Sequence, residues 1–170
     1  MTSRTVLVVY FSQSGTTRTL AETIARELDA DLEEIRETTK RRGILGVARS
    51  MLEVLLGRSP GLRPSTHDPS DYALVLIGTP VWAASVSGPV RAYLGQHKTR
   101  FPRVAFFATE GGRGADHVFS QMSEILGKQP EATLVLRQRD VVRTLAPTRD
   151  FVVSLGRASA GERLAASQSS

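Results

Sequence analysis

The sequence predicts an α/β fold, a three-layer doubly wound domain in which helices cover both faces of a five-stranded parallel sheet. Two observations lead to this prediction. Short apolar runs alternate with helical patterns along the 170 residues, and the runs do not alternate between apolar and polar side chains. Such runs are typical of strands that are buried on both faces. Strands and helices that alternate in this way form right-handed βαβ units.

Four apolar runs and one weaker candidate supply the strands. Each run is short, rich in Val, Leu or Phe, and bounded by turn or polar residues, which favours a strand. The runs cover residues 6–11, 73–77, 104–108 and 133–136, and the weaker candidate covers residues 31–36.

Helical patterns lie between the runs. Leu20, Ile24 and Leu28 recur every four residues, which predicts an amphipathic helix. Further helices are expected where a Pro or Gly marks a helix end. They cover residues 44–57, residues 90–94 after Gly88 and Pro89, residues 118–126 before Gly127, and residues 148–166. No repeat or linker divides the chain, so we expect one domain over residues 1–158 and a frayed or disordered tail over residues 159–170.

Composition excludes several classes of protein. The chain has no Cys, which excludes disulfides, thiolate metal sites and a Cys nucleophile, and its three His are well separated, which disfavours a metal site. No apolar segment reaches the length of a transmembrane span or of a signal peptide core. We therefore expect no transmembrane segment, no metal and a cytoplasmic location.

The turn after the first run predicts a phosphate site. This turn is hydroxyl-rich, contains one Gly and opens a helix, so free backbone N–H groups and the helix dipole favour an anion there. It lacks the Lys of a P-loop and the three Gly of a dinucleotide fingerprint, which leaves a single terminal phosphate as the best match. A simple helix cap is the alternative. The turn consists of Ser12, Gln13, Ser14, Gly15, Thr16 and Thr17.

With the first apolar run, this turn resembles the flavodoxin family, whose phosphate loop for flavin mononucleotide (FMN) usually reads [ST]-x-[ST]-G-x-T. Two further loops are similar to the family's flavin-contacting loops, and each follows a candidate strand. The resemblance covers about residues 4–128, and it implies strand order 2-1-3-4-5 with FMN bound where the order reverses. The cofactor-binding residues implied in these two loops are Thr79, Pro80, Val81, Trp82 and Ala83 in one, and Thr109, Glu110, Gly111, Gly112 and Gly114 in the other.

Specific roles follow from the resemblance. Trp82, the only Trp, is expected to lie against the flavin ring, and the backbone at Gly111 and Gly112 is expected to approach its pyrimidine edge. The third loop has no aromatic residue, which leaves one face of the ring open. No catalytic residue emerges, because neither a pair of carboxylates nor a Ser-His-Asp arrangement is recognisable.

Three functions are consistent with these sequence features. The first is an FMN protein that transfers electrons to redox partner proteins. The second is an NAD(P)H-dependent FMN reductase acting on a small-molecule acceptor such as a quinone. The third is a cofactor-free interaction domain.

The net charge of +5 is concentrated in two segments, residues 37–66 with a balance of +4 and residues 137–149 with a balance of +3. Many flavodoxins that carry electrons are acidic, so this chain departs from the usual pattern and is not expected to use the usual partners. The basic, amphipathic pattern around residues 40–57 predicts either a helix that covers the sheet or a docking face, a homodimer contact or a membrane-surface helix. Nucleic acid is not expected, because no recognition motif accompanies the charge.

Overall fold

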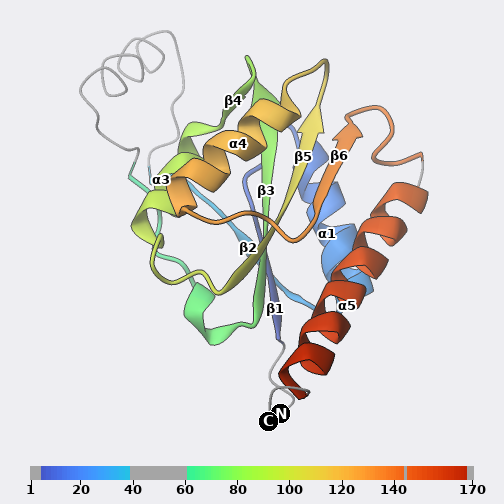
Figure 1. Cartoon of the computed structure of the whole chain (residues 1–170). Helices are drawn as coiled ribbons and strands as arrows, with labels where there is room; N and C mark the ends of the chain where they lie inside the picture. Colours follow the sequence, from blue (N-terminus) through green and yellow to red (C-terminus); the bar gives the residue numbers. More distant parts are fainter. Residues whose placement is uncertain (1–4, 39–60, 144, 168–170) are drawn as a thin grey trace, which may run out of the picture.

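We analysed a computed structural model that describes residues 5–38, 61–143 and 145–167, with side chains described as far as residue 156. The elements alternate between strand and helix, as the sequence predicts (Figure 1). In chain order they are β1 (Val6–Tyr10), α1 (Thr16–Leu28), β2 (Asp31–Glu34), the short 3-10 helix η1 (Pro69–Asp71), β3 (Leu74–Trp82), β4 (Ser85–Val86), α3 (Gly88–Gln96), β5 (Arg103–Glu110), α4 (Ala115–Leu126), β6 (Thr133–Arg137) and α5 (Ala146–Ser167). The predicted helix over residues 44–57 lies outside the described residues.

Five strands form a parallel sheet in the order β2-β1-β3-β5-β6. Counted along the chain without β4, this is the order 2-1-3-4-5, so that prediction is confirmed. Strand β4 was not predicted; it pairs antiparallel with the end of β3. Because these five strands are parallel, the loops that follow them all lie along one edge of the sheet, the edge formed by the carboxyl ends of the strands.

Helices cover the two faces of the sheet in pairs. Helices α1 and α5 pack on one face, where Leu20 and Phe151 meet Val8 of β1 in a buried cluster. Helices α3 and α4 cover the other face, where Val90 and Met122 pack in the cluster of the opposite face (Figure 1). The central strands are fully buried as a result, which explains their unbroken apolar runs.

The outer strand β6 differs from the expectation. Residues 133–136 were predicted to be buried on both faces, but β6 alternates: Leu134 and Leu136 are buried, whereas Val135 is 36% exposed. The reason is position, because β6 is an edge strand that pairs only with β5.

Helix α5 continues as helix to Ser167, although the sequence predicts a frayed or disordered tail over residues 159–170. Ala, Glu, Arg and Leu in this stretch have high helix propensity, which offsets the Gly and Ser residues among them.

Among the described helices, none is long and apolar enough to cross a membrane. The described residues also bring together no group of three or more His, Asp or Glu that could bind a metal ion.

Candidate functional site

The first loop leaves the start of α1 open. Gly15, the N-cap residue, has φ 93°, a conformation that L side chains rarely adopt, and among the described residues no side chain caps the first turn. The Gly15 N–H donates to Ser12 Oγ over 3.1 Å, which folds the loop back towards β1. The first turn contains no acidic residue. Its free N–H groups and the helix dipole can therefore hold an anion.

Hydroxyl groups surround this open helix end. The Ser14 and Thr16 hydroxyls lie 3.3 Å apart in an exposed hydrogen bond, and the Gln13 side chain is also exposed. Neutral O–H donors of this kind suit a phosphate that already receives backbone N–H bonds. The predicted phosphate loop is therefore assembled, and most of it is accessible to a ligand.

Thr17 and Thr109 have a different place. Both side chains are buried, and their hydroxyl oxygens lie 2.8 Å apart across the interior. Both were predicted as cofactor-binding residues, and in the structure each side chain is engaged by the other. The hydrogen bond ties the start of α1 to the end of β5, and so ties the first loop to the third.

The second loop is a hairpin rather than an irregular loop. Strand β3 continues to Trp82, and Val81 and Trp82 pair with Val86 and Ser85 of β4. The turn residues Ala83 and Ala84 have φ 48° and 53°, the pattern of a type I′ hairpin turn. Of the predicted residues, Val81, Trp82 and Ala83 lie at least partly at the surface of this hairpin.

Thr79 and Pro80 are buried beneath the hairpin. The Thr79 hydroxyl donates to the Pro80 carbonyl oxygen and lies 3.1 Å from the Ser87 hydroxyl, so it braces the hairpin from below. Pro80 lies beyond the last β1–β3 pair, at Tyr10 and Gly78, where a missing N–H removes no ladder hydrogen bond to β1. These two residues shape the second loop, and their side chains lie in the interior.

Trp82 connects the second loop with the first. Its ring is 40% exposed and meets the Phe11 ring edge-on, with ring centroids 5.8 Å apart and an interplanar angle of 89°. Edge-to-face contacts of this kind stabilise by about 0.5–1.5 kcal/mol. The contact fixes the direction in which the exposed indole faces.

The third loop contacts the hairpin through Gly114. This residue has φ 125°, and a Cβ atom built on it would lie 2.7 Å from the Ala84 Cβ and 2.8 Å from the Ala84 Cα. Gly111 and Gly112 are exposed, and a Cβ atom on either would meet nothing within 4 Å. The Glu110 carboxylate accepts the Ala115 N–H over 3.3 Å at the start of α4. The third loop is therefore packed at its end and open in its middle.

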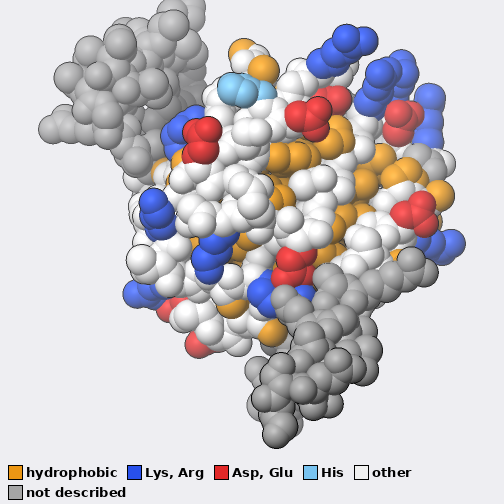
Figure 2. Space-filling view, viewed as in Figure 1, with side chains coloured by type: hydrophobic (Ala, Val, Ile, Leu, Met, Phe, Trp, Pro, Cys, Tyr) orange, Lys and Arg blue, Asp and Glu red, His pale blue; other side chains and the backbone are white. Residues whose placement is uncertain are grey.

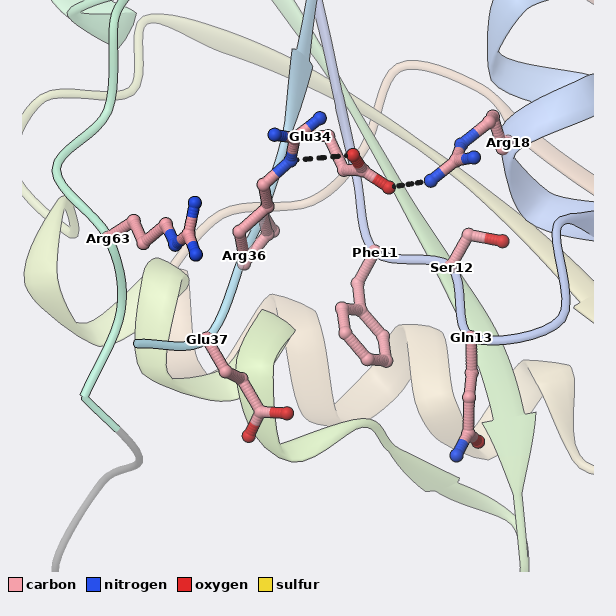
Figure 3. A pocket seen from close by; sticks show the side chains of 9 residues that line it. Phe11, Ser12, Gln13, Arg18, Glu34, Arg36, Glu37 and Arg63 are labelled. Atoms are coloured by element: carbon pink, nitrogen blue, oxygen red, sulfur yellow. Dashed lines mark hydrogen bonds and ion pairs between the residues drawn. The ribbon is translucent and has the colours of Figure 1, made fainter. Parts of the chain in front are cut away.

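A cavity of about 550 Å³ lies beside the first loop (Figure 3). Phe11, Ser12 and Gln13 line one side, and residues 34–37 and Arg63 line another. The Glu34 carboxylate lies between the guanidinium groups of Arg18 and Arg36 and is hydrogen-bonded to both. Burial raises the pKa of Glu34, but the hydrogen bonds from the two Arg outweigh it and hold that pKa below its ordinary value. Glu34 therefore stays ionised and keeps the two cations beside the loop.

The structure thus brings the three predicted loops together at one edge of the sheet. Sequence reasoning missed Phe11, which holds Trp82, and the ion-paired group of Arg18, Glu34 and Arg36. Only Phe11 had a signal, because it ends the apolar run that leads into the first loop. The contact between Gly114 and Ala84 was also missed.

Comparisons with known proteins agree on a family and a fold. A family model described as Flavodoxin matches residues 5–138. A flavoprotein from Lactobacillus acidophilus NCFM, solved in complex with FMN, is 27% identical with a TM-score of 0.66, and the match covers 82% of this chain and 97% of that one. A flavoprotein from Bacteroides eggerthii shares the fold at 21% identity and a TM-score of 0.67, over 85% of this chain and 97% of that one. No curated protein sequence matches the chain.

Proposed function

Since the chain belongs to the flavodoxin family, we propose that it binds FMN and transfers electrons through the bound flavin. The observation that carries the proposal is the open, Gly-led start of α1 with its exposed hydroxyls, to which two further loops are joined at the same edge of the sheet. The similar flavoprotein from Lactobacillus acidophilus that was solved with FMN supports the choice of cofactor.

The first loop fits the phosphate end of FMN. The free N–H groups at the start of α1 and the hydroxyls of Ser12, Ser14 and Thr16 would bind the phosphate oxygens. Thr17 would contribute through its backbone, because its hydroxyl is engaged by Thr109. The loop has no Lys, so backbone dipoles supply most of the positive potential.

The other two loops fit the ring end. The exposed indole of Trp82, held by Phe11, offers a flat apolar surface that would shield one face of the flavin from water. The open backbone at Gly111 and Gly112 would allow N–H groups to approach the polar edge of the ring. Bound FMN supplies the redox chemistry, and the protein supplies binding, orientation and the electrostatic environment.

A spectroscopic titration tests this proposal. Because Trp82 is the only Trp, tryptophan emission, excited where Tyr does not absorb, reports on the second loop alone. FMN should quench this emission, and flavin absorbance should appear in the purified protein. Riboflavin, which lacks the phosphate, should bind more weakly if the first loop holds that group. Protein that is colourless as purified and shows no quenching with excess FMN would refute FMN binding and favour the cofactor-free interaction domain.

A second candidate function is the reduction of a quinone or a similar acceptor by NAD(P)H. The observation that favours it is the open middle of the third loop, where Gly111 and Gly112 are exposed and carry no aromatic side chain that could cover the ring. Steady-state oxidation of NAD(P)H by the FMN-loaded protein, with and without a quinone, separates the two candidates. Turnover with a quinone would favour the reductase, and an absence of turnover would favour the electron carrier.

A further inference from the structure

The stretch of chain around the connection from β6 to α5 is rich in basic residues. We call residues 137–143 and 145–149 the basic segment; it contains four Arg and one Asp. The segment begins within β6, where the backbone of Arg137 lies opposite that of Glu110 in the β5–β6 ladder. The Gln138 N–H donates to the Glu110 carbonyl oxygen over 3.0 Å. It therefore leaves the sheet directly beside the third loop, at the same edge as the proposed FMN site (Figure 1).

The positive charge of this segment is largely uncompensated. In its one acidic residue, Asp140, a carboxylate oxygen lies 3.9 Å from the Arg139 Nε; the Arg139 side chain is 67% exposed and that of Asp140 is 38% exposed, so this pair is weak. Arg137, Arg143 and Arg149 are exposed and form no ion pair with any residue that the structure describes. Figure 2 shows Lys and Arg side chains gathered at the upper right, over the loop between β6 and α5. An excess of unpaired guanidinium groups attracts an acidic surface from a distance.

Apolar side chains stand among these Arg residues. Val142 is 79% exposed and Leu145 is also exposed, whereas Val141 between them and the sheet is buried and anchors the loop. A strongly exposed Val projects from the surface, so the segment is convex here and offers no enclosed site for a small molecule. Arg mixed with exposed apolar groups is typical of protein interfaces. A phosphate backbone would make no use of Val142, which disfavours nucleic acid.

We propose that the basic segment is the docking surface for a protein redox partner that carries an acidic patch beside its own redox centre. Arg139 and Arg143 steer the partner, and Val142 supplies the apolar contact once water is displaced. The role in electron transfer rests on the proposed function, but docking itself needs only the folded chain. The partner would then lie beside the third loop, close to the edge of the flavin.

The test compares two variants that remove the same charge. Arg139→Gln/Arg143→Gln changes the basic segment. Arg26→Gln/Lys98→Gln removes two exposed cations near the opposite edge of the sheet, in the last turn of α1 and in the turn after α3. The probe is a plant-type [2Fe–2S] ferredoxin with a large net negative charge, and a basic cytochrome c serves as the probe of opposite charge. Association rates are measured by surface plasmon resonance with both apo and FMN-loaded protein.

We expect the ferredoxin to associate faster than the cytochrome c, and its rate to fall as salt rises from roughly 0.01 M to 0.15 M. At low salt Arg139→Gln/Arg143→Gln should slow association by roughly 3–10-fold, while Arg26→Gln/Lys98→Gln leaves it nearly unchanged. Val142→Ser should speed dissociation with little effect on association. Equal losses in the two charge variants, or faster binding of the cytochrome c, would overturn the proposal.

The outcomes separate this proposal from the proposed function. Protein that binds FMN but does not favour the ferredoxin overturns the docking surface alone. Colourless protein that still docks the ferredoxin through the basic segment supports the docking surface and overturns FMN binding. A loss of NADPH binding in Arg139→Gln/Arg143→Gln, with ferredoxin docking intact, would overturn the docking surface and assign the segment to a dinucleotide.

Discussion

Replacement of Gly114 by Ala should destabilise the protein and displace the hairpin that carries Trp82. Gly114 has φ 125°, and an L residue in such a conformation costs about 1–3 kcal/mol. The added methyl group would also lie 2.7 Å from the Ala84 Cβ and 2.8 Å from its Cα, closer than van der Waals contact. Because the Cα is backbone, the hairpin must shift as a unit, which adds about 1–3 kcal/mol of overpacking.

Together the two effects predict a loss of about 2–6 kcal/mol in the free energy of unfolding, a large part of the 5–15 kcal/mol typical of domains. Urea unfolding followed by far-UV circular dichroism measures it, and the emission of Trp82 reports the hairpin separately. Gly111→Ala is the matched control, because its φ is not positive and its Cβ would meet nothing within 4 Å. If Gly114→Ala were as stable as Gly111→Ala and had the same emission, the reasoning about this contact would be refuted.

Three further perturbations have defined outcomes. Thr17→Val and Thr109→Val should each lower the free energy of unfolding by about 1–3 kcal/mol, because each leaves a buried hydroxyl without its partner, while the double variant should be close to wild type; strictly additive losses in urea unfolding would contradict this. Gly15→Ala should weaken FMN binding roughly tenfold in fluorescence titrations, because an Ala resists φ 93°, with Gly88→Ala, whose φ is not positive, as the unaffected control. Burial lowers the pKa of His97 below its ordinary 6.5, so the neutral form is favoured in the folded state and stability is lost as the pH falls below that value. His97→Asn should therefore lose less stability than wild type between about pH 7.5 and about pH 5 in urea unfolding, and an equal loss in both proteins would exclude His97 as the cause.

The central sheet was predictable because burial on both faces leaves an unbroken apolar run. The run that contains Val8 and the run that contains Leu76 each became a strand at the middle of the sheet. Edge strands could not be separated from central ones in this way, since Val135 is apolar although it is 36% exposed. Which strand is outermost depends on how the strands pair, and the local amino-acid composition does not determine that pairing.

The three loops of the site were predictable from the sequence, but the contacts that join them were not. The hairpin turn at Ala83 and Ala84 carries none of the Asn or Gly residues that usually mark a type I′ turn, so strand β4 had no signal. The contacts of Trp82 with Phe11 and of Gly114 with Ala84 join segments that are distant in sequence. Such contacts follow from the assembled tertiary structure rather than from any local pattern.

The hydrogen bond between Thr17 and Thr109 has a consequence for the kinetics of cofactor capture. It is buried and joins the start of α1 to the end of β5 through two side chains of the protein itself, without a ligand atom between them. A pocket organised in advance loses little entropy when it is filled. Association with FMN should therefore proceed in one concentration-dependent phase, without a slow step in which the loops first rearrange.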